Sequence, residues 1–158
     1  MTTLDSQLLE YLAEENRAVG ALLGLIREEQ ELLVQSRVQD MQPVIQHKAE
    51  HVAQLARLAA RRHALLDAHG CAASETGMQQ WLARHPQPQV DEAWRNLLGQ
   101  VRSAKEVNRT NGLLIHTQLN RNRAALGVLS GGVTSLDNLY GPNGQTSHPA
   151  PSLGHVVG

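Results

Sequence analysis

The chain has 158 residues, of which 41% are hydrophobic, 18% charged and 3% aromatic, and it contains no phenylalanine. This length predicts one domain, and the shortage of aromatic residues disfavours an all-β sandwich. Lys and Arg total 14 against 15 Asp and Glu, a net charge of -1, so there is no global basic footprint and we expect no nucleic-acid partner.

The cysteine content and the N-terminal residues favour a soluble, cytoplasmic protein. Cys71 is the one cysteine, so it has no partner for an intramolecular disulfide. The N-terminal segment is acidic where a signal peptide would be basic, and the longest apolar stretch, 18–26, is far shorter than the ~20 residues that span a bilayer. We therefore expect no membrane insertion.

Hydrophobic periodicity predicts two long helices in the first half of the chain. Apolar residues at steps of three, four and seven run from Leu4 to Leu33 and predict a helix over 3–36. A second helix is predicted over 41–69, with Asp40 as its N-cap and Gly70 just past its end. Arg61 and Arg62, near the end of this helix, are expected on a solvated face. The Gly- and Pro-containing connector that follows has room for a short helix over 78–84.

The last predicted helix, 90–129, has the most regular pattern in the sequence. Alternating steps of four and three residues define a seam that keeps a coiled-coil register: Trp94, Leu98, Val101, Lys105, Asn108, Gly112, Ile115, Leu119, Asn122, Leu126 and Leu129. The Asn111-Gly112 pair often marks a hairpin, but the heptads cross it without a slip, so we predict helix there.

Charge distinguishes the first and last of these helices. The first carries seven acids against two arginines, whereas the last carries six Lys and Arg against three acids. Complementary charges of this kind are expected to select neighbouring helices. After Leu129 the composition becomes rich in Gly and Pro, so 130–158 is predicted to be a flexible tail. The expected fold is all-α, an elongated bundle of three long helices over 1–129 with a short connector helix.

The sequence contains no convincing catalytic or metal site. His47 and His51 have the i,i+4 spacing of a helical zinc pair but lack a third ligand, and Cys71 beside His69 is more often incidental than nucleophilic. A glycine-rich phosphate loop is also absent. We therefore expect a protein that is not an enzyme and needs no cofactor and no metal.

The polar residues in the seam have two interpretations. Asn at a seam position commonly fixes register inside a closed coiled coil. Alternatively, a seam that mixes Leu and Ile with Asn and a close-approach Gly forms a groove for another amphipathic helix. Both interpretations apply to Asn108 and Asn122.

Two segments of the second half resemble a known family. The run Asn108-Arg109-Thr110-Asn111-Gly112-Leu113-Leu114-Ile115, followed by Leu139-Tyr140-Gly141-Pro142-Asn143-Gly144-Gln145, resembles FlgN-type flagellar type III export chaperones. The residue-level resemblance covers about 94–145, and the first half matches in layout only. It implies a chaperone that binds the C-terminal helical segments of the hook-filament junction proteins (hook-associated proteins one and three), prevents their premature assembly and delivers them to the export apparatus.

The resemblance also implies two sets of site residues. The substrate surface is expected to contain Asn108, Asn111, Gly112, Leu113, Ile115, Leu119, Asn122, Leu126 and Leu129. Tyr140, with Gly141 and Gly144 in a turn, is expected to dock on the cytoplasmic domain of the membrane export gate, unless it folds back to pin the tail on the bundle. The alternative function is a structural or signalling adaptor that self-associates through the seam.

Overall fold

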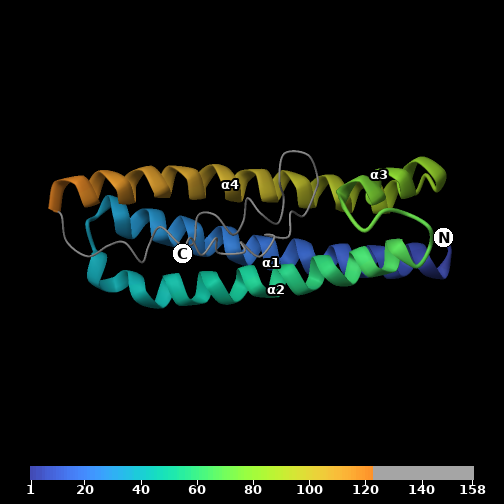
Figure 1. The fold of residues 1–158 in the computed structure, drawn as a ribbon, viewed down its shortest axis with the longest axis horizontal. Helices are drawn as coiled ribbons and strands as arrows, with labels where there is room; N and C mark the ends of the chain where they lie inside the picture. Colours follow the sequence, from blue (N-terminus) through green and yellow to red (C-terminus); the bar gives the residue numbers. More distant parts are fainter. Residues whose placement is uncertain (123–158) are drawn as a thin grey trace, which may run out of the picture.

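Three long helices lie side by side in the computed structural model, which describes residues 1–122 (Figure 1). They are α1 (Thr3–Val34), α2 (Met41–Asp67) and α4 (Pro88–Asn122); the 3-10 turn η1 (Val38–Asp40) joins the first two, and α3 (Glu75–Arg84) precedes the last. In Figure 1, α1 runs between α2 and α4, with α2 antiparallel and α4 parallel to it. The predicted all-α, elongated bundle is confirmed.

The helix ends differ from the expected ones by a few residues. α1 ends two residues early because Ser36 turns the chain with a φ of 56°, and α2 ends at Asp67, ahead of Gly70 with a φ of 75°. α3 begins at Glu75, three residues before the expected start. α4 continues as a helix through Asn111 and Gly112, as expected. Residues 123–158, which include the predicted domain boundary and the tail, lie outside the described residues.

Two helix starts show how capping side chains act here. The Thr2 hydroxyl accepts from the Asp5 amide, and the Asp5 carboxylate accepts from the Thr2 amide, so α1 begins with a reciprocal capping box. Asp40 occupies the predicted N-cap position of α2, but it makes no capping bond. Asp40 is the last residue of η1 and has helical rather than extended backbone angles, so its carboxylate is not placed as a cap and instead accepts from Arg37 Nε at 2.9 Å.

The core is mainly aliphatic and forms two clusters. The larger joins all three long helices and α3 through buried residues that include Leu22, Leu55, Met78, Trp81, Trp94 and Leu97. The smaller closes the far end of the bundle around Leu32, Leu33, Met41, Val44 and Ile115. The two tryptophans supply the bulk that phenylalanine supplies in other cores.

Two buried ion pairs cross from α1 to α2. Glu15 Oε1 lies 2.7 Å from Arg62 Nε, and Glu29 Oε1 lies 3.2 Å from Lys48 Nζ. Opposite these pairs, α4 contributes the Trp94 ring, 4.8 Å from the Arg62 guanidinium carbon, and the Asn108 amide, which accepts from Lys48. The members of the two layers are fourteen residues apart in each of the three helices.

An apolar layer separates these two polar layers. Leu22, Leu55 and Val101 lie one heptad from each polar layer on their respective helices, and all three are buried. The bundle therefore repeats in heptads, with polar, apolar and polar layers in succession.

The opposite net charges of α1 and α4 predicted ion pairs between these two helices, but the structure places the ion pairs elsewhere. α1 does pack along α4, but the ion pairs between helices in the described part of the chain join α1 to α2. Net helix charge did not predict them because two cations of α2 turn inward and meet glutamates of α1. Arg62 is fully buried, so its expected place on a solvated face is wrong.

Candidate functional site

The predicted seam on α4 divides into two rows with different environments. Val101, Asn108 and Ile115 form a buried row, with exposed fractions of 3–4%. The second row consists of half-buried residues, spaced seven apart: Leu98, Lys105, Gly112 and Leu119. One row therefore belongs to the core, while the other lies at its edge, within reach of a partner.

The amides of Asn108 and Asn111 are used inside the bundle. Asn108 Oδ1 accepts from Lys48 Nζ at 2.5 Å, and Asn111 Nδ2 donates to Ile26 O and Glu29 Oε1, both at 2.8 Å. Both residues are at least 97% buried. For Asn108, the structure therefore matches the first interpretation of a seam asparagine, a residue that fixes helix register within a closed core.

The other residues of the expected substrate surface fall in different places. Leu113 is 57% exposed, Ile115 is buried, and Gly112 and Leu119 are half-buried. Asn122 is the last residue of α4. The rest lie outside the described residues: Leu126, Leu129, Tyr140, Gly141 and Gly144.

Hydrogen bonds show which side of α4 faces α1. Ala93 O accepts from Asn16 Nδ2 at 3.0 Å, and Gln118 Nε2 donates to Leu33 O at 2.6 Å. Because successive helix residues are turned by 100°, the half-buried row lies on the other side of the buried row from these contacts. The half-buried row therefore borders α2.

α2 contributes a second half-buried strip, formed by Ile45, Val52, Ala56 and His63. Ile45 and Leu119 pack against the same small cluster, and Val52 and Leu98 against the large one, so the strips of the two helices border a common face. We call Leu98, Lys105, Gly112 and Leu119 together with Ile45, Val52 and Ala56 the α2–α4 face. Sequence reasoning assigned the site to α4 alone, although the spacing of Ile45, Val52 and Ala56 was a usable signal.

The electrostatics of this face are set by cations. Burial and the adjacent Arg62 charge lower the pKa of His63 from 6.5 to about 4, so His63 is neutral at physiological pH. Lys105 lies within the half-buried row. Burial raises the pKa of the Glu75 carboxyl, and the nearby charges of Arg62 and Lys105 oppose that shift.

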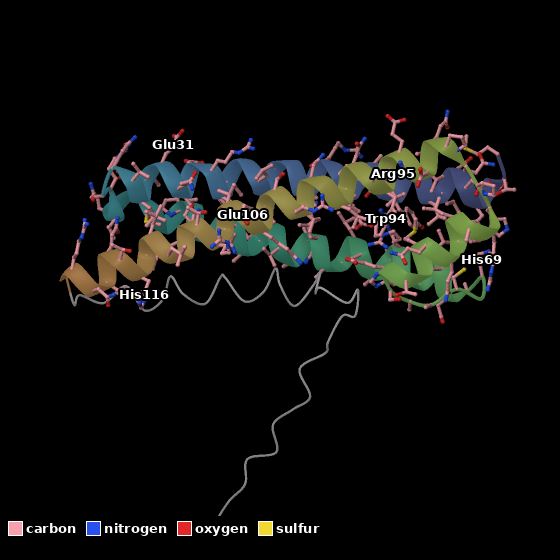
Figure 2. The ribbon with its side chains drawn as sticks, turned by 90° about the horizontal axis from the view of Figure 1, so that it is seen from above. Glu31, His69, Trp94, Arg95, Glu106 and His116 are labelled. Atoms are coloured by element: carbon pink, nitrogen blue, oxygen red, sulfur yellow. The ribbon has the colours of Figure 1, made fainter. Side chains whose placement is uncertain are left out.

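α3 covers one end of the face. Met78 and Trp81 are buried in the same cluster as Val90, Trp94 and Leu97, at the end of the bundle where α4 begins (Figure 1). Figure 2 shows Trp94 directed into the region between α4 and α2. Beyond Glu75, the first residue of α3, no further element in the described part of the chain covers the face.

The histidines and the cysteine of residues 1–122 are not gathered into a metal-binding cluster. No group of three or more His, Cys, Asp or Glu side chains in residues 1–122 is arranged to hold a metal ion. Cys71 is buried in the core, and His51 Nδ1 lies 2.8 Å from His47 O, an ordinary helix contact. In this part of the chain, no helix has the length and hydrophobicity to span a bilayer.

Within residues 1–122, the molecule is a heptad-patterned bundle with a partly apolar face that its other elements leave uncovered, an arrangement typical of proteins that bind other helices. Comparison with family models matches residues 1–148 to the model described as FlgN protein, and the chain belongs to this family of flagellar export chaperones. The match extends over the first half, where the sequence resembled the family in layout only. No curated protein and no solved structure matches the chain significantly.

Proposed function

We propose that this chaperone binds the C-terminal helical segments of the hook-filament junction proteins, hook-associated proteins one and three, in the cytoplasm. It holds them unassembled and delivers them to the flagellar type III export apparatus without catalysing a reaction. Membership of the FlgN family supports the general role. The α2–α4 face, which no element within residues 1–122 covers beyond α3, is the structural observation that carries the proposal.

The exported segment binds as an amphipathic helix along the α2–α4 face, beyond the end of α3. From Leu98 to Leu119 the half-buried row extends for about 32 Å at 1.5 Å per residue, the length of three heptads. Leu98 and Leu119 bury the apolar side of the incoming helix, and Gly112 permits close approach because it has no side chain. Leu126 continues the same row in the sequence, seven residues after Leu119.

The remaining residues of the expected surface have separate roles. Asn108, Asn111 and Ile115 hold α4 against α1 and α2, so they support the face from beneath. Leu113 is exposed on α4, and in the sequence Asn122 and Leu129 continue the seven-residue spacing of Asn108 and Ile115. An exported segment that is disordered before binding loses conformational entropy when it folds on the face, so the net binding free energy is smaller than the contacts alone would give.

The test is calorimetry with a synthetic C-terminal segment of hook-associated protein one. Replacing Leu119 by Ala removes apolar contact with the segment and is expected to raise Kd about tenfold, with a smaller effect on unfolding. Val34→Ala is the matched control, because Val34 is 68% exposed on α1, away from the face. An unchanged Kd with a collapsed melting temperature for Leu119→Ala would show that this row is only core.

Light scattering distinguishes the alternative function. An adaptor that self-associates through the seam requires a dimer of the chain without its cargo. The proposed chaperone instead forms a complex with the exported segment whose mass equals the sum of the two partners.

We further propose that Tyr140, presented by Gly141 and Gly144, docks on the cytoplasmic domain of the export gate. An aromatic ring with a hydroxyl buries a large area for two side-chain torsions, which makes it an effective anchor. Tyr140→Ala is expected to leave cargo affinity intact while lowering gate binding and cargo secretion. Unchanged gate binding and secretion would remove this role, and a lower melting temperature would indicate that Tyr140 pins the tail to the bundle.

A further inference from the structure

A row of three arginines, continued by a histidine, runs along α4 beside the α2–α4 face. Arg95, Arg102, Arg109 and His116 are exposed and recur every seven residues. Each lies three or four residues from a member of the half-buried row, so the two rows are neighbours on the helix surface. Figure 2 shows Arg95 and His116 along the outer surface of α4.

The bundle makes little use of these cations. Arg95 pairs with Asp91 at 3.0 Å and Arg109 with Glu106 at 2.7 Å, both within α4 and at the surface. Exposed pairs of this kind contribute little and are readily exchanged for other partners. Arg102 takes part in none of the ion pairs between described residues.

The facing strip of α2 does not neutralise the row either. The α2 side of the face is formed by Ile45, Val52 and Ala56, which carry no charge, and His63 is kept neutral by burial. A helix lying on the face would therefore have an uncharged strip on one flank and a row of exposed arginines on the other, of which Arg102 forms no ion pair with a described residue.

We propose that the exported helix bound by this face carries acidic residues at seven-residue spacing on the flank next to Arg95, Arg102 and Arg109. This inference rests on the proposed function and adds the chemical character of the cargo. The heptad period of the cations matches the period at which a packed helix presents the same flank. Charge complementarity of this kind sets register and speeds association more than it adds affinity.

The same argument favours another chain over the tail of this one. Residues 130–158 contain a single acid, Asp137, and one carboxylate cannot match three arginines spaced seven residues apart. A nucleic acid is also a poorer match, because no Trp, Tyr or Phe lies in the row to stack on bases.

The experiment measures binding of the full chain to the synthetic C-terminal segment of hook-associated protein one at several salt concentrations. Arg102→Glu is expected to raise Kd about fivefold at low salt and to flatten the salt dependence. Arg57→Glu is the matched control: Arg57 is exposed on α2, away from the face, and the same charge change there is expected to alter Kd less than about twofold. Circular dichroism verifies that both variants are folded.

A charge exchange makes the test specific. Replacing the acidic residues of the segment's repeating flank by lysine is expected to weaken binding to the natural chain and to restore binding to Arg102→Glu. If the segment binds Arg102→Glu as tightly as the natural chain and without salt dependence, the acidic-flank inference is wrong and the proposed function stands. If the natural chain does not bind the segment at all, both fail. Displacement of the segment by a DNA oligonucleotide at equal affinity would also overturn the inference, because the row would then recognise phosphate.

Discussion

Arg62 and Glu15 form an ion pair that is wholly withdrawn from solvent. Arg62 Nε donates to Glu15 Oε1 at 2.7 Å and Arg62 Nη2 to Glu15 Oε2 at 3.3 Å, and both side chains have an exposed fraction of 0%. Such a pair recovers in attraction roughly what it loses in hydration, so its main effect is on which arrangement of helices is permitted. The guanidinium also faces the Trp94 ring, so one side chain ties together all three long helices.

Breaking this pair from one side is expected to be costly. Arg62→Met leaves Glu15 charged and buried without its partner, which should lower the free energy of unfolding by about 3–5 kcal/mol. The double variant Arg62→Met, Glu15→Leu removes both charges and is expected to recover most of the loss. Urea unfolding of the natural chain and the variants measures both effects. A single variant as stable as the natural chain would contradict the role assigned to the pair.

The bundle is expected to lose stability in mild acid through His63. Its pKa is about 4 in the folded chain and near 6.5 when unfolded, so between these values the unfolded chain binds one more proton. The free energy of unfolding therefore falls as the pH drops from about 6.5 to about 4. His63→Gln should reduce this slope, as measured by urea unfolding at pH 7 and pH 5. His47→Gln, at an exposed position on the same helix, is the control and should leave the slope unchanged.

Two glycine-to-alanine substitutions are expected to change the stability of the bundle in opposite directions. A Cβ added at Gly77 would lie 1.7 Å from Ala72 O, which is backbone, so Gly77→Ala must displace the loop before α3 and is expected to lower the melting temperature. Nothing lies within 4 Å of a Cβ added at Gly24, in the middle of α1. Gly24→Ala is therefore expected to stabilise by up to about 1 kcal/mol. Thermal unfolding of both variants measures whether the melting temperature falls for Gly77→Ala and rises for Gly24→Ala. A higher melting temperature for Gly77→Ala would show that the loop moves without cost.

Asn111→Ala tests whether the hydrogen bonds that hold α4 against α1 stabilise the bundle below the α2–α4 face. The substitution removes two donated hydrogen bonds, one of them to the buried Glu29 carboxylate, and is expected to cost about 1–3 kcal/mol in the free energy of unfolding. Asn120→Ala, at an exposed site on α4, is the control and should change little. Denaturant unfolding gives both values. Equal effects of the two substitutions would mean that the Asn111 contacts contribute nothing to stability.

The sequence predicted the fold well because the signal for it is local. Periodicity depends only on neighbouring residues, and it predicted both ends of α1 and α2 and the start of α4 to within a few residues. The continuous helix through Asn111 and Gly112 was also predicted, since an unbroken heptad outweighs a single unfavourable glycine.

The candidate site was harder to predict because it depends on contacts between distant segments. The seam pattern could not show that Val101, Asn108 and Ile115 face inward while Leu98 and Leu119 lie at the edge, because that depends on where α2 lies. Nor did the adjacent pair Arg61 and Arg62 reveal which cation is buried. The side chains of neighbouring helix residues point in directions 100° apart, so only one of the two arginines can face the core. Arg62 is that residue because it meets the buried Glu15 of α1.

The spacing of the two polar layers also limits how α1 and α2 can close on each other. A shift of one heptad in one direction would place Lys48 beside Leu22 and Arg62 beside Leu8, and in the other direction it would place Arg62 beside Leu22 and Glu29 beside Leu55. A shift of two heptads would restore only one pair. The hairpin of these helices thus has one alignment in which both ion pairs form. Two ion pairs buried between α1 and α2 thereby determine which side chains the α2–α4 face presents.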